Sequence, residues 1–182
     1  MIEFRAGGIE DGAIRLRLRS DADVPALIEA CRDPAVVRWT RVPEDYDEAK
    51  AAEWAERSER MLADGSGLPL VIADARSDRF IGSIGINHID YEERRCDIGY
   101  FLAPQARGRG AMTRAIRLLA AWAFDNLPVD RIEILIQPEN EPSRRAAERA
   151  GFTFEGILRS HTIIKGARRD MCSYALLRGE RA

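Results

Sequence analysis

CDIGYFLAP at Cys96–Pro104, QARGRG at Gln105–Gly110 and AMTRAIRLLAAWAFDN at Ala111–Asn126 form the stretch that decides the fold. An apolar run ends at a proline, a loop with two glycines follows, and an amphipathic helix begins inside that loop. The start of a helix offers unpaired backbone N–H groups and the positive end of the helix dipole, and glycine permits close backbone approach. The stretch therefore predicts a strand, an anion-binding loop and a helix.

The segments around this stretch predict where the loop lies in the fold. The apolar run at 132–137 predicts a second strand, so strand 96–103, helix 109–126 and strand 132–137 form a β-α-β unit with a right-handed crossover. The two strands end at Pro104 and Pro138 on the same edge of the sheet. Ligands in open α/β sheets bind outside such carboxyl ends, so we expect the glycine loop and residues 140–143 to converge on a site there.

The rest of the chain alternates between strand-like and helix-like periods. We expect residues 1–12 to be a loosely ordered lead and residues 13–180 to form a single domain of α+β (mixed α/β) class. The expected helices cover residues 20–31, 36–39, 48–64 and 142–150, and the other expected strands cover 14–19, 68–75, 80–89, 152–158 and 171–177. The last two strands are expected to be joined by a loop at 161–170.

Composition restricts the function classes. With 182 residues, 28 basic and 30 acidic side chains and a net charge of −2, the chain has no basic character that favours nucleic acid. Cys31, Cys96 and Cys172 lack metal-ligand spacing, so we expect buried free thiols, no metal and a cytoplasmic location. No apolar run approaches the length of a membrane span, so no membrane partner is expected.

The glycine loop alone is a weak motif. A Rossmann assignment fails because Thr113 stands where a third small residue is wanted, and a P-loop assignment fails because no Gly-Lys-Ser/Thr follows. A tight glycine turn that serves packing remains an alternative until the second motif is considered.

Two motifs together resemble the GNAT superfamily of N-acetyltransferases. Gln105–Gly110 is similar to the family's Gln/Arg-x-x-Gly-x-Gly/Ala loop, and Asn140–Phe152 is similar to its Asn-x-x-Ser…Gly-Phe signature. Residues 154–156, Phe-Glu-Gly, continue as in the RimJ/RimL-like group, which acetylates the N-terminal amine of ribosomal proteins. The resemblance implies a central, mostly antiparallel sheet of about seven strands with splayed strands 4 and 5, which are residues 96–103 and 132–137, and flanking helices.

The resemblance also implies an acetyl-CoA site. Backbone N–H groups from Arg107 to Ala111 would bind the pyrophosphate, and the strand would pair with the pantetheine arm and hold the acetyl oxygen through the Leu102 N–H. The side chains of Arg107 and Arg109 are candidates for phosphate contacts, with solvated arginines as the alternative. The residues implied for the cosubstrate are Phe101, Leu102, Ala103, Gln105, Arg107, Gly108, Arg109, Gly110, Ala111, Asn140 and Ser143.

The catalytic groups are less well indicated. Many family members carry a proton-donating tyrosine on the short helix, but Ala147 stands at that place, so Ser143 is our candidate for the acid. Asp97 is our candidate for the base, because several family members have a carboxylate on this strand. Each has a structural role as its alternative. The position where some relatives have another carboxylate is Thr162, and other candidates are His161, His88 and Glu133.

The acceptor is predicted only as a class. Aromatic and acidic side chains between the first helices suit a cationic amine, although acids at a helix start are equally explained by the helix dipole. These residues are Trp39, Glu44, Asp45, Tyr46, Asp47 and Glu48. We predict an N-acetyltransferase acting on a protein N-terminus or small amine. An aminoglycoside-type acetyltransferase and a CoA-binding module without turnover are the alternatives, and a homodimer is left open.

Overall fold

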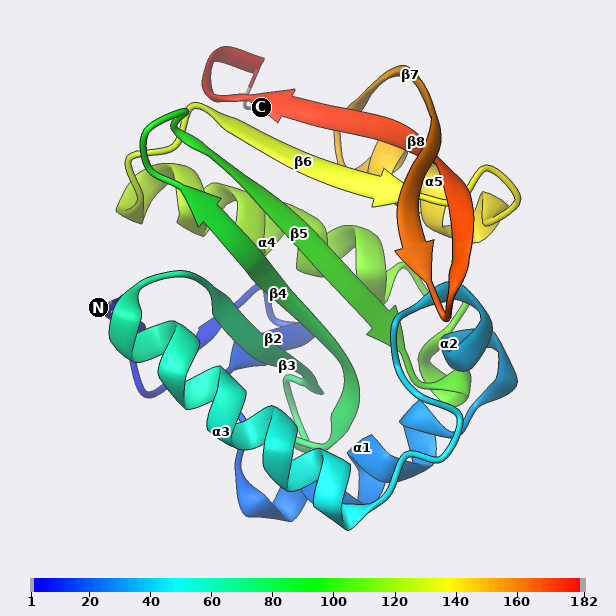
Figure 1. Ribbon diagram of the computed structural model, residues 1–182. Helices are drawn as coiled ribbons and strands as arrows, with labels where there is room; N and C mark the ends of the chain where they lie inside the picture. The colour runs from blue at the N-terminus through cyan, green and yellow to red at the C-terminus, as the bar shows by residue number, and fades with distance from the viewer. Residues whose placement is uncertain (1, 181–182) are drawn as a thin grey trace.

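The computed structural model describes residues 2–180, and its strands form one eight-stranded sheet in the order β1-β2-β3-β4-β5-β6-β8-β7 (Figure 1). All neighbouring strands are antiparallel except β5 and β6, which are parallel. The strands are β1 (Ile9–Glu10), β2 (Ile14–Arg17), β3 (Leu68–Asp74), β4 (Phe80–Asp90), β5 (Arg95–Leu102), β6 (Arg131–Ile136), β7 (Thr153–Ile164) and β8 (Ala167–Leu177).

Within residues 2–180, five α-helices accompany the sheet: α1 (Val24–Cys31), α2 (Pro34–Trp39), α3 (Glu48–Asp64), α4 (Ala111–Asn126) and α5 (Glu141–Arg149). Short 3-10 turns cover Asp21–Asp23, Pro104–Ala106 and Arg178–Glu180. The α3 boundaries follow from its caps, because the Asp47 side chain accepts from the Lys50 N–H and Gly65 adopts a left-handed conformation. The mixed α/β class and the splayed, mostly antiparallel sheet are confirmed. The sheet has one strand more than expected because β1 adds to its edge.

Helices cover both faces of the sheet, and side-chain alternation along β3 shows how. Leu70 and Ile72 belong to the core cluster that α4 completes, whereas Val71 and Ala73 belong to the cluster that includes buried residues of α1 and α3. Figure 1 shows α4 behind β4 and β5, with α3 in front of the sheet. This arrangement leaves the carboxyl ends of β5 and β6 at one edge, beside the start of α4.

Residues 2–12 are held more firmly than the loosely ordered lead we expected. Ile2 is buried and its N–H donates to the Leu62 carbonyl at 3.0 Å. Phe4 packs edge-on against Trp122 with 5.3 Å between ring centroids, and Ile9–Glu10 pairs with β2. The partners of Ile2 and Phe4 lie on α3 and α4, so no local pattern at the start of the chain could indicate these two contacts.

The expected loop at 161–170 was wrong, because β7 and β8 continue into a tight hairpin. Its turn, Lys165–Gly166, has positive φ angles of 48° and 76°, as two-residue hairpin turns require. The Lys165 ammonium donates to the Val37 carbonyl, so the hairpin tip lies against α2 (Figure 1). Most side chains of β7 are exposed on both faces, which hides the alternation that would have predicted the strand.

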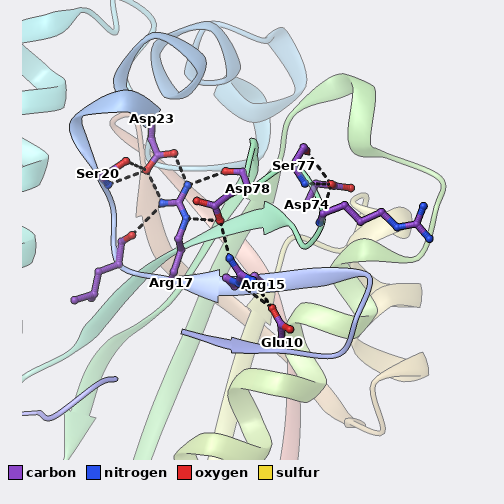
Figure 2. Close-up of polar contacts among 10 residues, drawn as sticks. Glu10, Arg15, Arg17, Ser20, Asp23, Asp74, Ser77 and Asp78 are labelled. Atoms are coloured by element: carbon purple, nitrogen blue, oxygen red, sulfur yellow. Dashed lines mark hydrogen bonds and ion pairs between the residues drawn. The ribbon is translucent and has the colours of Figure 1, made fainter. Parts of the chain in front are cut away.

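A buried ion pair fixes the start of α1 to the sheet (Figure 2). The Arg17 guanidinium donates to both carboxylate oxygens of Asp23 at 2.7 and 2.8 Å, and to Asp78 in the turn after β3 at 3.0 Å. Asp23 also accepts from the Ser20 N–H at 2.8 Å, as part of a capping box at the start of this segment. Burial would raise the pKa of Asp23, but the hydrogen bonds from Arg17 and Ser20 outweigh it and hold that pKa below its usual value.

Candidate active site

β5 and β6 pair only over their first residues and then diverge. Their parallel register joins Arg95 to Arg131, Cys96 to Ile132 and Asp97 to Glu133 and ends there. Beyond this point β5 stays with β4 and β6 stays with β8. We call the opening between the two strands the wedge; it widens toward the starts of α4 and α5 (Figure 1).

The backbone of β5 presents polar groups to the wedge. The Ala103 N–H donates to the Ile81 carbonyl at 3.0 Å, so Ala103 points its N–H toward β4. Because N–H and C=O directions alternate along a strand, those of Tyr100 and Leu102 point the other way, into the wedge, while Phe101 points toward β4. Of the expected strand contacts, Leu102 is therefore the residue whose backbone faces the wedge.

The glycine loop has the conformation and the free donors of an anion site. Gly108 and Gly110 have φ angles of 76° and 77°, and a Cβ on either would meet nothing within 4 Å. Within the described part of the chain, the N–H groups of residues 108–112 donate no hydrogen bond, whereas the Arg107 N–H donates to Pro104 at 3.3 Å. Free donors therefore begin at Gly108, one residue later than expected, and converge on open space at the start of α4.

The arginines of the loop differ in their contacts. The Arg107 guanidinium donates to the Asp33 carboxylate and to the Leu102 carbonyl, the latter at 3.1 and 3.3 Å. Asp33 also accepts from the first N–H groups of α2, so Arg107 connects the loop to that helix. Arg109 and Gln105 are exposed. Arg107 thus holds the conformation of the loop, whereas the exposed Arg109 guanidinium makes no hydrogen bond or ion pair within residues 2–180.

Asp97 lies where β5 and β6 begin to separate. The Asn87 amide donates to Asp97 at 2.9 Å, and Gly99 makes room for it, because a Cβ there would be 2.5 Å from the Asn87 nitrogen. Burial raises the pKa of Asp97 above its usual value, and the hydrogen bond from Asn87 offsets this only in part. A partly buried carboxylate with a raised pKa suits proton abstraction.

The alternative bases are placed less favourably. Glu133 lies beside Asp97 but is ion-paired with Arg131 at 2.7 Å. His88 is in register with Asp97 on β4 and is exposed, as is His161 on β7. Thr162 pairs with Arg169 in the β7–β8 hairpin. Asp97 remains the carboxylate next to the wedge that has no cationic partner within hydrogen-bonding distance among residues 2–180.

Asn140 and Ser143 begin α5 on the other side of the wedge. The Asn140 side-chain oxygen accepts from the Ser143 N–H at 3.3 Å, which caps the helix. The Ser143 hydroxyl lies 3.0 Å from the hydroxyl of Tyr100, a residue that the sequence reasoning missed. A signal was present: Tyr100 occupies a core-facing position of β5, and a partly buried tyrosine hydroxyl needs a partner.

The residues expected to contact the acceptor mostly have local partners. Asp47 caps α3, Asp45 pairs with Lys50 at 3.1 Å, Tyr46 is buried, and the Arg38 guanidinium stacks 4.5 Å from the Trp39 ring centroid. Nearby, α2, Glu44 and the hairpin tip border a groove of about 330 Å³. Its lining is Pro34, Val37, Arg38, Glu44, Ile164, Lys165 and Arg169.

Across residues 2–180 no group of three or more His, Cys, Asp or Glu side chains is arranged to hold a metal ion. None of the helices in that range is long and apolar enough to span a bilayer. All three cysteines are buried and free, and burial raises the pKa of Cys31 and of Cys96 to about 12, so neither is an activated thiol.

Known proteins share both the sequence and the fold. The family described as "Acetyltransferase (GNAT) domain" matches residues 14–153. The "Uncharacterized N-acetyltransferase p20" of Bacillus licheniformis is 32% identical over 92% of this chain and 96% of that protein. The "Putative ribosomal N-acetyltransferase YdaF" of Bacillus subtilis (strain 168) is 30% identical over 87% and 75%. The structure of Mycobacterium smegmatis RimJ in complex with CoA-disulfide is 25% identical, with a TM-score of 0.81 over 96% and 85%.

Proposed function

This chain belongs to the acetyltransferase (GNAT) domain family and is an acetyl-CoA-dependent N-acetyltransferase of RimJ/RimL-like type, and we propose that the transfer takes place in the wedge between β5 and β6. The observation that carries the proposal is the end of β5–β6 pairing at Asp97 and Glu133, which opens a wedge that widens toward the glycine loop (Figure 1). This leaves backbone donors from two elements open at one place.

The residues at the wedge fit acetyl-CoA. The N–H groups of residues 108–112 and the positive end of α4 would hold the pyrophosphate, with Gln105 and Arg109 at its exposed side. The Leu102 carbonyl accepts from Arg107, but the Leu102 N–H is free on the wedge side of β5, where the strand, with Phe101 and Ala103 on either side, would lie along the pantetheine arm. Asn140 caps α5 through its oxygen and keeps its NH₂ group for the same arm. Arg107 shapes the loop through Asp33 and Leu102.

The chemistry of the chain's own groups supports direct transfer. Acetyl-CoA supplies an activated thioester with a thiolate leaving group. Asp97 removes a proton from the ammonium form of the acceptor through bridging water, because about 16 Å of strand separates Asp97 from Leu102. The Leu102 N–H stabilises the carbonyl oxygen while it is negative. As the N–C bond forms and the C–S bond breaks, the Ser143 hydroxyl stabilises the departing thiolate by a hydrogen bond, and the second proton of the attacking amine passes through water to the sulfur. The base and the hydrogen-bond donor to sulfur thus lie on opposite sides of the wedge, on β5 and α5.

The acceptor is an amine, and we propose a protein N-terminus. A relative named as a putative ribosomal N-acetyltransferase supports this choice. The groove between α2 and the β7–β8 hairpin is where an extended chain would lie, and its mixture of apolar and charged side chains suits a peptide better than a polyamine. An aminoglycoside-type acceptor is the alternative. We further propose a cytoplasmic location, one domain over residues 13–180, and no nucleic-acid or membrane partner; a homodimer remains to be tested.

An amine panel with a free-thiol readout tests the function. N-terminal alanine and serine peptides, spermidine and an aminoglycoside are each offered with acetyl-CoA, and CoA release above the rate without acceptor is measured. We expect release with at least one peptide. Tight acetyl-CoA binding without acceptor-dependent release would instead support the CoA-binding module, and release with the aminoglycoside alone would favour that acceptor.

A further inference from the structure

Tyr100 makes a contact across the wedge. Its backbone belongs to β5, yet its hydroxyl lies 3.0 Å from the Ser143 hydroxyl and 3.5 Å from the Ser143 carbonyl, at the start of α5. β5 and β6 no longer pair at this level, so the two sides of the wedge meet here through a side chain. The contact therefore fixes where Ser143 lies relative to the β5 edge.

Either hydroxyl can donate in the Tyr100–Ser143 contact, and the direction from Tyr100 to Ser143 is part of our inference. Burial raises the pKa of Tyr100 to about 12, so the phenol keeps its proton at neutral pH and has one O–H to donate. The Ser143 N–H is already donated to Asn140. When the phenol donates to the Ser143 hydroxyl oxygen, the Ser143 proton is left without an acceptor in the described residues and is available to a group in the wedge.

We infer that Tyr100 is a positioning residue for the acyl transfer, which orients the Ser143 hydroxyl so that its proton points at the departing sulfur. This inference rests on the role proposed for Ser143. A chain of two hydrogen bonds, from Tyr100 to Ser143 and from Ser143 to sulfur, also makes Ser143 a stronger donor than an isolated serine. Tyr100 thereby supplies in part what Ala147, where many family members have tyrosine, cannot.

Proton transfer from Tyr100 itself is not required. A phenol with a pKa of about 12 would protonate a thiolate, whose conjugate thiol has a pKa near 8.5, with an equilibrium about 3,000-fold unfavourable. Tyr100 therefore stays protonated through the reaction. Its role is to donate a hydrogen bond and fix the serine rotamer. Ser143 likewise keeps its proton, and the sulfur takes the second amine proton through water.

A double-mutant cycle tests the inference, with the acceptor taken from the amine panel. We expect Tyr100→Phe to lower kcat about tenfold, with KM for acetyl-CoA within about twofold, and Ser143→Ala to lower kcat about tenfold or more. Because Tyr100 acts through Ser143, the double variant should be no slower than Ser143→Ala alone. Tyr174→Phe is the matched control, since Tyr174 contacts α5 through Arg144 and Glu148 and not Ser143.

A second readout uses the free enzyme. In protein labelled with ¹³C at the tyrosine ζ carbon, the Tyr100 resonance is identified by its loss in Tyr100→Phe. It should move on Ser143→Ala, and by more than on Tyr174→Phe, since Tyr174 influences Tyr100 only from a distance. Additive kcat losses, an unchanged kcat in Tyr100→Phe, or a resonance that ignores Ser143→Ala would each overturn the inference. If the wild-type enzyme shows no acceptor-dependent thiol release, the proposed function is refuted, together with the roles of Ser143 and Tyr100. This outcome is distinct from a failure of the Tyr100 inference alone, in which the wild type remains active.

Discussion

Replacing Gly110 by alanine separates the folding role of the glycine loop from its binding role. Gly110 precedes α4 with a φ of 77°, and a Cβ would meet nothing within 4 Å. The substitution therefore adds no clash in the free protein and costs only the strain of a left-handed alanine, about 1–2 kcal/mol. The same methyl group would project into the open space where we place the pyrophosphate.

The loss in binding can be worked from the donors at this position. If the methyl group keeps the phosphate from two backbone N–H groups, at about 1.5 kcal/mol for each hydrogen bond to a charged group, the loss is about 3 kcal/mol, or about 100-fold in Kd. At acetyl-CoA near 100 times the wild-type Kd, the ligand stabilises the wild type by about 2.7 kcal/mol and the variant by about 0.4 kcal/mol. For a chain of this size these correspond to rises in Tm of about 5–11 °C and 1–2 °C.

The assay is thermal unfolding with and without acetyl-CoA, supported by calorimetric titration. Gly12→Ala is the matched control, because Gly12 also has a positive φ, 85°, and open space around its Cβ, but lies outside the wedge. It should lose similar stability and keep the full ligand-induced rise. A Gly110→Ala protein with the wild-type rise, or a Gly12→Ala protein without it, would refute the assignment of the loop.

Two further substitutions test the base and the anchor of α1. Since the pKa of Asp97 is raised and the base must be ionised, kcat/KM should fall as pH drops through that pKa. Asp97→Asn should lower kcat/KM about 100-fold and abolish this fall at acidic pH. If the fall persists in Asp97→Asn, another group is the base. Arg17→Met should lower the free energy of unfolding by about 3 kcal/mol at pH 7, because it leaves the Asp23 carboxylate, 4% exposed, without its partner. Because the pKa of Asp23 is lowered in the folded state, this stabilisation is present above about pH 4 and is lost as pH falls through the folded-state pKa. In urea unfolding at pH 3, the difference in free energy of unfolding between wild type and Arg17→Met should therefore be smaller than at pH 7. An equal difference at both pH values would argue against the ion pair.

The parts of the fold that were predictable are those specified by local pattern. The glycine loop and the helix after it were recognisable from Gln105–Asn126, and two prolines marked where the strands end. α4 begins two residues later than expected, at Ala111, because Gly110 takes the left-handed conformation as its N-cap. These features depend on residues near one another in the chain, so periodicity and turn chemistry suffice.

The features that were missed depend on distant residues. Nothing in β5 itself indicates that the Tyr100 hydroxyl reaches Ser143, because that contact exists only once α5 is placed beside the wedge. The Arg107 side chain looked like a phosphate ligand, and its partner Asp33 lies 74 positions earlier. The final hairpin was not predicted because most side chains on both faces of strand β7 are exposed, so apolar and polar residues do not alternate along it.

The contact of the hairpin tip with α2 has a consequence for how such enzymes diversify. One wall of the groove comes from residues 34–39 and the other from residues around Lys165, whereas the glycine loop and the starts of α4 and α5 lie between them in sequence. Substitutions in these two segments can therefore reshape the groove, where we propose that the acceptor lies, as long as the contact of Asp33 with Arg107 at the start of α2 is kept. Related enzymes with the same cosubstrate site can in this way act on different amines, and such enzymes would differ chiefly in those two segments.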